Sequence, residues 1–301
     1  MVSVCMITYG HEKYIKEAIE SILMQECNFD VELIISNDVS PDNTDQIIQG
    51  IMDNHPKAFW IKYTKHQKNI GMMPNFLYAL KQCRGKYIAL CEGDDYWTDS
   101  LKLQKQVDYL DNHSECSLTI HNVAKMDFDG TTKILNGIES NQIIDFKRLI
   151  KFDFAIPTCS WVFRNNFEFS NWILQCGVGD WPLLFLLLKD SYCYYFADIL
   201  GVYRKHIGGV SNKINSSNYY LVHIQALELF NKYERHHKKR EINQGLSLLY
   251  LRAYIYERIN NNFKIYYLLR SFYFNPSTFV LTRKKTALYW TLPIKLRNII
   301  R

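Results

Sequence analysis

Residues 87–95 read YIALCEGDD, an apolar run that passes directly into three carboxylates. The apolar part, Tyr87–Cys91, has the length and composition of a buried strand. The acidic part, Glu92–Asp95, begins the turn that follows. Carboxylates this close together repel one another unless a cation or hydrogen-bond donors compensate for their charge. The alternative is a solvated acidic turn that caps the next helix, since carboxylates favour helix N-termini.

Three similar strand patterns precede this stretch, at Val2–Thr8, Val31–Ser36 and Phe59–Thr64. Apolar residues recur at helical spacing between them, in the ranges 14–23, 44–52 and 73–83. Repeated strand–helix units with short links predict a parallel sheet covered by helices. Ligands collect at the carboxyl ends of the strands in such a sheet, so we expect the strand ends to form one site.

The rest of the chain predicts further strands and then helices only. After the acidic turn, we expect a helix over Ser100–Asn112 capped by Asp99 or Ser100, strands at Cys116–Met126, Thr132–Leu135 and Thr158–Phe163, and a buried helix at Trp181–Lys189. Beyond Ser216 the periodicity is entirely helical. These patterns predict two domains, residues 1–215 and residues 216–301.

Composition limits the class of protein. With 48% hydrophobic and 22% charged residues in a chain of 301, extensive disorder is excluded. The longest apolar run, Trp181–Leu188, is too short to span a membrane, and the N-terminus lacks the pattern of a signal peptide. The eight cysteines form no C-x-x-C pair, which predicts reduced, buried thiols of a cytoplasmic protein and no zinc cluster.

Charge divides the chain unevenly. From Lys232 to Arg301 there are 15 Lys and Arg against 3 Asp and Glu, whereas the preceding residues hold 21 against 27. A basic C-terminal region of this kind could contact an anionic membrane surface from the cytoplasmic side. Nucleic acid is disfavoured as a partner, because the sheet-bearing part is net acidic and the basic region contains no recognised binding motif.

Four strand-end motifs resemble the family-2 glycosyltransferases with the GT-A fold. They are Ile7–His11, Asp38–Thr44, Asn69–Gly71 and the D-x-D-type segment Glu92–Asp95, and they occur in the family's order over about the first hundred residues. The resemblance implies a GT-A-type, Rossmann-like mixed sheet flanked by helices, with an α-helical C-terminal extension. It also implies that residues 1–215 bind a nucleotide-sugar and carry catalysis.

The resemblance implies a nucleotide-diphosphate sugar donor, with a UDP-sugar favoured. Residues expected to bind it are Thr8, Tyr9, Gly10 and Asp38 at the base and ribose, and Lys68 at the diphosphate or base. Gly10 stands where the family more often has Asn, a change that removes no carboxylate.

The same resemblance implies a divalent cation, Mn²⁺ or Mg²⁺. Asp94 would hold the metal that bridges the donor phosphates, with Glu92 and Asp95 acting directly or through water. Glu92 replaces the family's commoner Asp. His206, in the late segment Tyr203–Ser211, would complete the metal shell or touch the diphosphate, and Arg204 would neutralise phosphate charge.

Catalysis by this family requires a base that deprotonates the acceptor hydroxyl. Asp180, which opens the helix at Trp181, fits that position, although a capping role is the alternative and the two are compatible. Trp161 and Arg164 resemble the acceptor-side strand, where an aromatic ring could stack on a sugar. A core position for Trp161 remains equally open.

These features together predict an inverting, metal-dependent transferase that acts on a hydroxyl of a glycan or lipid-linked acceptor in surface polysaccharide synthesis. Two alternatives remain. One is a catalytically silent module that recruits partners or membrane through its basic region. The other is a nucleotidyltransferase, disfavoured because Tyr9–Lys13 is a poor loop for gripping a triphosphate. No G-x-G-x-x-G follows a strand, which disfavours a dinucleotide dehydrogenase.

Overall fold

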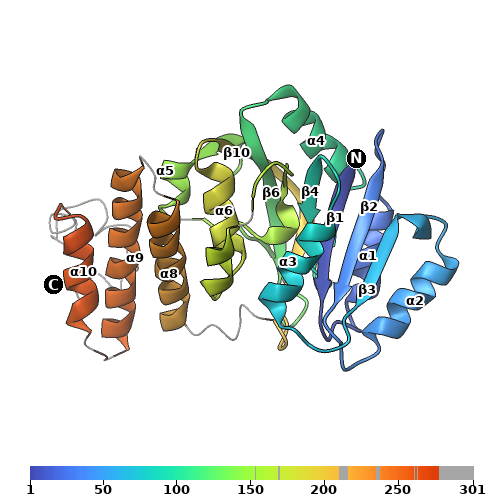
Figure 1. Cartoon of the computed structure of the whole chain (residues 1–301), viewed down its shortest axis with the longest axis horizontal. Helices are drawn as coiled ribbons and strands as arrows, with labels where there is room; N and C mark the ends of the chain where they lie inside the picture. The colour runs from blue at the N-terminus through green and yellow to red at the C-terminus, as the bar shows by residue number, and fades with distance from the viewer. Residues whose placement is uncertain are drawn as a thin grey trace. The chain divides into compact units, whose positions relative to one another are not determined.

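The computed structural model describes residues 1–152, 154–168, 170–209, 216–234, 238–260, 262 and 264–277 (Figure 1). The chain forms two compact units, each built from several segments. The first unit comprises Met1–Phe146, Asp153–Phe169 and Leu186–Asn212, and the second comprises Lys147–Phe152, Ser170–Phe185 and Lys213–Arg301. The sequence-based division at residue 216 stays a prediction.

The first unit begins with four parallel strands in the order β3-β2-β1-β4. These are β1 (Val2–Thr8), β2 (Val31–Asn37), β3 (Ile61–Lys65) and β4 (Tyr87–Leu90). The helices between them are α1 (Ile15–Leu23), α2 (Thr44–Asn54) and α3 (Met72–Gln82), with a short 3-10 helix η1 (Ala58–Trp60) before β3. The predicted strand–helix alternation is confirmed, including the parallel pairing that gathers the strand ends at one edge.

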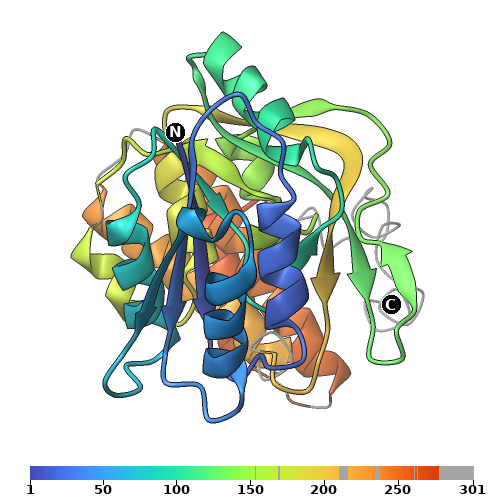
Figure 2. The same ribbon diagram turned by 90° about the vertical axis from the view of Figure 1, so that its right-hand side faces the viewer.

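The sheet continues beyond β4 with strands of both directions, in the order β4-β9-β6-β10-β5. They are β5 (Tyr96–Trp97), β6 (Cys116–Met126), β9 (Val162–Arg164) and β10 (Tyr192–Arg204), with β7 (Thr132–Ile134) paired to β6 and β8 (Gln142–Asp145) paired to β10. Strand β9 is antiparallel to both neighbours, whereas β10 runs parallel to β6. Figure 2 shows β10 as a long curved strand beside β6.

Two of the predicted elements of the first unit start differently in the structure. The expected strand at Thr158–Phe163 starts as a 3-10 turn, η2 (Thr158–Ser160), because Ser160 N–H donates to the carbonyl of Pro157 and Trp161 N–H to that of Thr158. Helix α4 (Lys102–Asn112), which comes after the acidic turn, begins later than the expected Ser100, and the Asp99 carboxylate accepts a hydrogen bond from the N–H of Leu101 just before it.

The second unit consists of helices. They are α5 (Phe146–Leu149), the 3-10 helix η3 (Asn171–Gln175), α6 (Asp180–Leu188), α8 (Ser216–Tyr233), α9 (Lys239–Ile259) and α10 (Ile265–Phe274), with α5 and α6 crossing its boundary. Helix α9 packs against both α8 and α10. Within the described residues from 216 to 277, the predicted helical region is confirmed. None of the helices described is long and apolar enough to cross a membrane.

Part of the basic C-terminal region falls outside the described residues. The run Arg235–His237 does so, as does the segment 278–301 with its cluster Arg283–Lys285. The cysteines are all described and free, and seven of the eight are buried.

Candidate functional site

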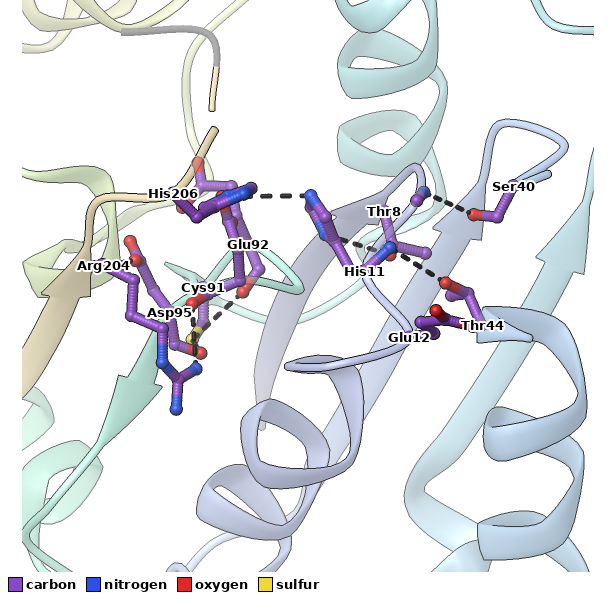
Figure 3. Close-up of polar contacts among 12 residues, drawn as sticks. Thr8, His11, Glu12, Ser40, Thr44, Cys91, Glu92, Asp95, Arg204 and His206 are labelled. Atoms are coloured by element: carbon purple, nitrogen blue, oxygen red, sulfur yellow. Dashed lines mark hydrogen bonds and ion pairs between the residues drawn. The ribbon is translucent and has the colours of Figure 1, made fainter. Parts of the chain in front are cut away.

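Four loops meet at the carboxyl-end edge of the first unit's sheet, after β1, β2, β4 and β10 (Figure 3). Backbone-to-side-chain hydrogen bonds join the first two: Gly10 N–H donates to Ser40 Oγ at 3.0 Å, and His11 N–H donates to Thr44 Oγ1 at 2.9 Å. The acidic turn joins them where Gly93 N–H donates to the carbonyl of Ile7 at 3.1 Å. The predicted convergence of these strand ends is therefore present.

Asp94 lies between two histidines at the centre of this edge. His206 Nε2 is 2.8 Å from Asp94 Oδ2, and His11 Nε2 is 3.9 Å from the same oxygen. Potential ligand atoms of the three residues all lie within 4.8 Å of one another. Burial acts to raise the pKa of Asp94, but the hydrogen bond from His206 and the nearby histidine charges hold that pKa below its ordinary value.

The donor set of this cluster fits a divalent first-row cation. Imidazole nitrogen together with a carboxylate oxygen is a common protein ligand set for such ions, whereas Mg²⁺ prefers oxygen ligands. Burial lowers the pKa of His11, which favours the neutral imidazole that a metal requires. The motifs of the sequence predicted Asp94 and His206 here but indicated no role for His11. Its position in the loop after the first strand could have indicated that it lies close to the other strand ends.

The two other carboxylates of the acidic turn have different partners. Glu92 Oε2 accepts a hydrogen bond from Thr158 Oγ1 at 2.7 Å, and Asp95 Oδ1 accepts one from the backbone N–H of Arg204 at 2.8 Å. Asp95 is buried, and burial together with the charges of Asp94 and Glu92 raises its pKa well above the usual range. Neither residue belongs to the described histidine–aspartate cluster, so their direct contact with a metal stays a prediction.

Gly93 lets the acidic turn approach the loop after β1. A Cβ atom at this position would lie 2.8 Å from Thr8 Oγ1, 2.9 Å from His11 Nδ1 and 2.9 Å from Ile15 Cδ1. Real Cβ atoms do not come that close to other heavy atoms. A larger residue here would push the acidic turn away from His11.

Arg204, the last residue of β10, hydrogen-bonds to the backbone of the acidic turn. Its Nη1 donates to the backbone carbonyl of Asp94 at 2.9 Å, its Nη2 pairs with the carboxylate of Glu17, and its guanidinium lies 4.2 Å from the centre of the Tyr96 ring. The side chain is buried. The structure thus places Arg204 beside the predicted metal residues, with its donors directed at the protein; its contact with donor phosphate stays a prediction.

Asp38 joins the loop after β2 to the segment before α3. One carboxylate oxygen accepts the N–H of Ile70 at 2.7 Å and the other that of Gly71 at 2.9 Å, while Asn69 Nδ2 donates to the Asp38 carbonyl at 3.0 Å. The next residue, Val39, has a positive φ of 62°, which is strained for a β-branched side chain. Strain of this kind collects at functional loops.

The other residues predicted to bind the donor lie around this edge with different exposure. Thr8 is buried and its Oγ1 is 3.2 Å from His11 Nδ1. Tyr9 is half exposed, at 51%, and Lys68 is exposed. The side chains of Tyr9 and Lys68 are thus accessible to solvent, whereas Thr8 contacts the histidine beside it; donor binding by all three stays a prediction.

The residues predicted for the acceptor side do not point outward. Trp161 is fully buried, and its Nε1 donates to the carbonyl of Ile156. Arg164 donates to the carbonyls of Cys116, Leu110 and His113, which fixes the end of α4. These contacts give both residues structural roles, and their position does not support stacking on or binding a sugar.

Asp180 lies in the second unit, where it opens α6 as expected. Its Oδ1 accepts the N–H of Trp181 at 2.9 Å. Burial raises the pKa of Asp180, and the neighbouring His223 counteracts that rise. His223 is itself buried, with Nδ1 against the carbonyl of Tyr219. A buried carboxylate with a raised pKa is a better proton acceptor than an exposed one.

Comparison with known proteins places this geometry in a family. The chain is 35% identical over 209 residues to the uncharacterized protein Rv1520 of Mycobacterium tuberculosis, an overlap of 69% of this chain and 60% of the relative. It is 32% identical over 120 residues to the abequosyltransferase RfbV of Salmonella typhimurium, covering 39% of this chain and 35% of RfbV. The chain thus spans less than two thirds of the length of either relative.

Solved structures share the fold. TarS 1–349 of S. aureus in complex with UDP-GlcNAc matches with a TM-score of 0.61 at 16% identity, covering 99% of this chain and 78% of TarS. The mannosyltransferase PcManGT of Pyrobaculum calidifontis, in complex with GDP-Man and Mn²⁺, matches with a TM-score of 0.57 at 13% identity, covering 99% and 82%. The family model described as "Glycosyl transferase family 2" matches residues 3–169, more than half of the chain. With its GT-A fold and its strand-end site, the chain belongs to glycosyl transferase family 2.

Proposed function

We propose that this protein transfers a sugar from a nucleotide-diphosphate donor to an acceptor hydroxyl, with inversion and with a divalent cation. The observation that carries the proposal is the cluster of His11, Asp94 and His206 at the carboxyl-end edge of the sheet in a chain of this family. Such an edge is where α/β sheets bind nucleotides. A cation bound there would offset the negative charge that develops on a departing diphosphate.

The residues around the cluster prepare the site for the donor. Asp94 and His206 would hold the cation, and Arg204 keeps the backbone of Asp94 in place from the end of β10. Asp38 ties two loops together where the base and ribose would bind. Tyr9 and Lys68 are exposed and would contact the nucleotide or its phosphates.

Asp180 is our candidate for the base that removes the proton from the acceptor hydroxyl. Burial raises its pKa toward the range in which a carboxylate accepts a proton effectively near neutral pH. Its oxygen would take that proton as the acceptor oxygen attacks the anomeric carbon. Its hydrogen bond to Trp181 N–H fixes the carboxylate at the start of α6.

Relatives support a place in cell-surface polysaccharide synthesis. They include the abequosyltransferase RfbV and the Bacillus subtilis minor teichoic acid biosynthesis protein GgaB. We favour a UDP-sugar donor, Mn²⁺ as the cation, and a glycan or lipid-linked acceptor. We further propose that the enzyme works in the cytoplasm, with the basic C-terminal region contacting the inner face of the membrane.

The proposal predicts metal-dependent use of a nucleotide-sugar. Purified protein with MnCl₂ and a panel of UDP- and GDP-sugars should release nucleoside diphosphate from at least one of them. The Asp94→Asn variant should lose about 100-fold or more of that rate, because it removes a charged ligand from the site. Asp53→Asn, which changes an exposed carboxylate on α2, is the matched control and should retain full activity.

A second variant separates catalysis from binding. Asp180→Asn should lower transfer to the acceptor by about 10²–10⁴-fold while leaving the calorimetric affinity for UDP with Mn²⁺ unchanged. Full turnover by Asp94→Asn would refute the site. Metal-dependent UDP binding without turnover of any donor by the native protein would favour a silent binding module.

A further inference from the structure

We propose that His11 is a third protein ligand of the cation, so that the site has two imidazoles and one carboxylate and prefers Mn²⁺ or Co²⁺ over Mg²⁺. This inference rests on the proposed function and deepens it. It assigns a ligand that the motif resemblance did not supply. It also makes metal preference a property of this chain's own residues.

The three ligands come from three separate strand ends. His11 follows β1, Asp94 follows β4 and His206 follows β10. Figure 3 shows the two histidine rings directed toward each other across the acidic turn. Their ring centres are 5.8 Å apart and nearly perpendicular. With all the ligand atoms within 4.8 Å of one another, one ion could contact the three residues after small side-chain movements.

The surroundings hold His11 in an orientation suited to a ligand. Its Nδ1 lies 3.2 Å from Thr8 Oγ1, which leaves Nε2 as the atom that faces Asp94. Metal-binding histidines usually have their second ring nitrogen engaged in this way, because that contact fixes the ring and its tautomer.

The backbone of His11 is equally constrained. Its N–H donates to Thr44 Oγ1, and its carbonyl accepts the N–H groups of Tyr14 at 2.9 Å and Ile15 at 2.8 Å. Because Gly93 has no side chain, the acidic turn can lie directly against the imidazole, where a Cβ would come within 2.9 Å of His11 Nδ1. The Tyr14 ring lies against His206, with ring centres 4.8 Å apart, and so restricts the other histidine.

The ligand set determines which cation is favoured. Mg²⁺ keeps oxygen ligands and dehydrates reluctantly, so a second imidazole gains little for it. Mn²⁺ and, more strongly, Co²⁺ accept imidazole nitrogen. Each histidine should therefore widen the difference in affinity between these ions and Mg²⁺.

The test measures metal binding by the full-length chain, without reference to turnover. Calorimetry with MnCl₂, CoCl₂ and MgCl₂ should show that His11→Gln weakens Co²⁺ and Mn²⁺ binding by about 10–100-fold and Mg²⁺ binding by less than about threefold. His206→Gln should behave similarly. His55→Gln, at the end of α2, is the matched control and should leave all three affinities unchanged.

A measurement on the native protein keeps the inference testable if the variant does not fold. Pulsed electron paramagnetic resonance of the Mn²⁺-loaded chain should show nitrogen couplings from two imidazoles. A single imidazole, or unchanged metal preference in a folded His11→Gln variant, would overturn the inference. Two imidazoles in a protein that transfers no sugar would leave it standing and remove the proposed function instead.

Discussion

Lys102 places an amine in the interior, next to the strand that carries the acidic turn. Its side chain is fully buried, with Nζ 3.8 Å from the centre of the Trp97 ring, and it makes no hydrogen bond to any other described residue. Burial lowers its pKa to about 7, while nearby Cys91 and Cys159 oppose that shift. The folded protein therefore holds fewer protons than the unfolded chain between pH 7 and 10.5.

The lowered pKa of Lys102 predicts an unusual pH dependence of stability. The cost of burying a protonated amine is complete below pH 7 and is relieved as the pH rises toward 10, so the native protein should gain about 3 kcal/mol between pH 7 and 9.5 relative to Lys102→Met. Urea unfolding of both proteins across this range measures the difference. Lys81→Met, an exposed lysine on α3, should show no such trend. Parallel pH profiles for native and Lys102→Met would contradict the assignment.

Individual site residues were predictable to different degrees. Asp94 and His206 were predicted to lie together because Asp94 belongs to the D-x-D-type segment and His206 to the late segment Tyr203–Ser211, both of which resemble the family. His11 was given no role although it ends the motif Ile7–His11, because its proximity to Asp94 depends on how two loops 83 residues apart in sequence pack together. The Asp94 carboxylate contacts His206, whereas the Asp95 carboxylate accepts a hydrogen bond from the backbone N–H of Arg204. Sequence alone does not reveal these different partners.

At the scale of elements, the first four strands were predictable because each is a short, buried apolar run between helical patterns. Strand β10 was not predicted. Its pairing with β6 is interrupted by irregularities between Phe196 and Ile199 and between Ile199 and Val202, and these interruptions disturb the regular alternation of a strand. The 3-10 turn η2 was also not predicted, because its residues were read as the start of a strand.

The turn between α3 and β4 offers a test of close packing. A Cβ on Gly85 would lie 2.6 Å from the backbone nitrogen of Ser3 and 2.8 Å from the carbonyl oxygen of Tyr87, neither of which can rotate away. Gly85→Ala should therefore lower the free energy of unfolding by about 1–3 kcal/mol. Gly50→Ala, on an open face of α2, should instead raise it by about 0.5–1 kcal/mol. Chemical denaturation compares the two variants; an equal or stabilising effect of Gly85→Ala would contradict the packing described.

At the scale of the whole molecule, the sequence revealed the acidic first part and the basic C-terminal region directly, because net charge is a sum over residues. It did not reveal that segments 147–152 and 170–185 group with the C-terminal helices, because this depends on long-range packing. Gly245 of α9 illustrates this packing within the second unit, since a Cβ there would lie 3.1 Å from both Ile150 and Leu227.

The excess of positive charge in the basic C-terminal region predicts membrane association that is sensitive to salt. In a flotation assay, the full-length chain should be recovered with phosphatidylserine-containing vesicles at low salt, and much less with phosphatidylcholine vesicles or at 0.5 M NaCl, because screening removes the attraction of the basic region. Replacing Arg283, Lys284 and Lys285 by Gln should reduce recovery, whereas the same change at Lys62, Lys65 and Lys68 should not. Equal recovery from both kinds of vesicle would argue against membrane contact.

The contacts of Arg204 and His206 have a consequence for how the site is assembled. Both residues contact Asp94, from which they are separated by 110 and 112 positions in the sequence. A nascent chain released only as far as residue 169, where the family match ends, would already contain the acidic turn but lack both of its supports. The proposed cation site should therefore form late during translation, and a truncated chain of that length should bind no Mn²⁺ even if its early strands pair.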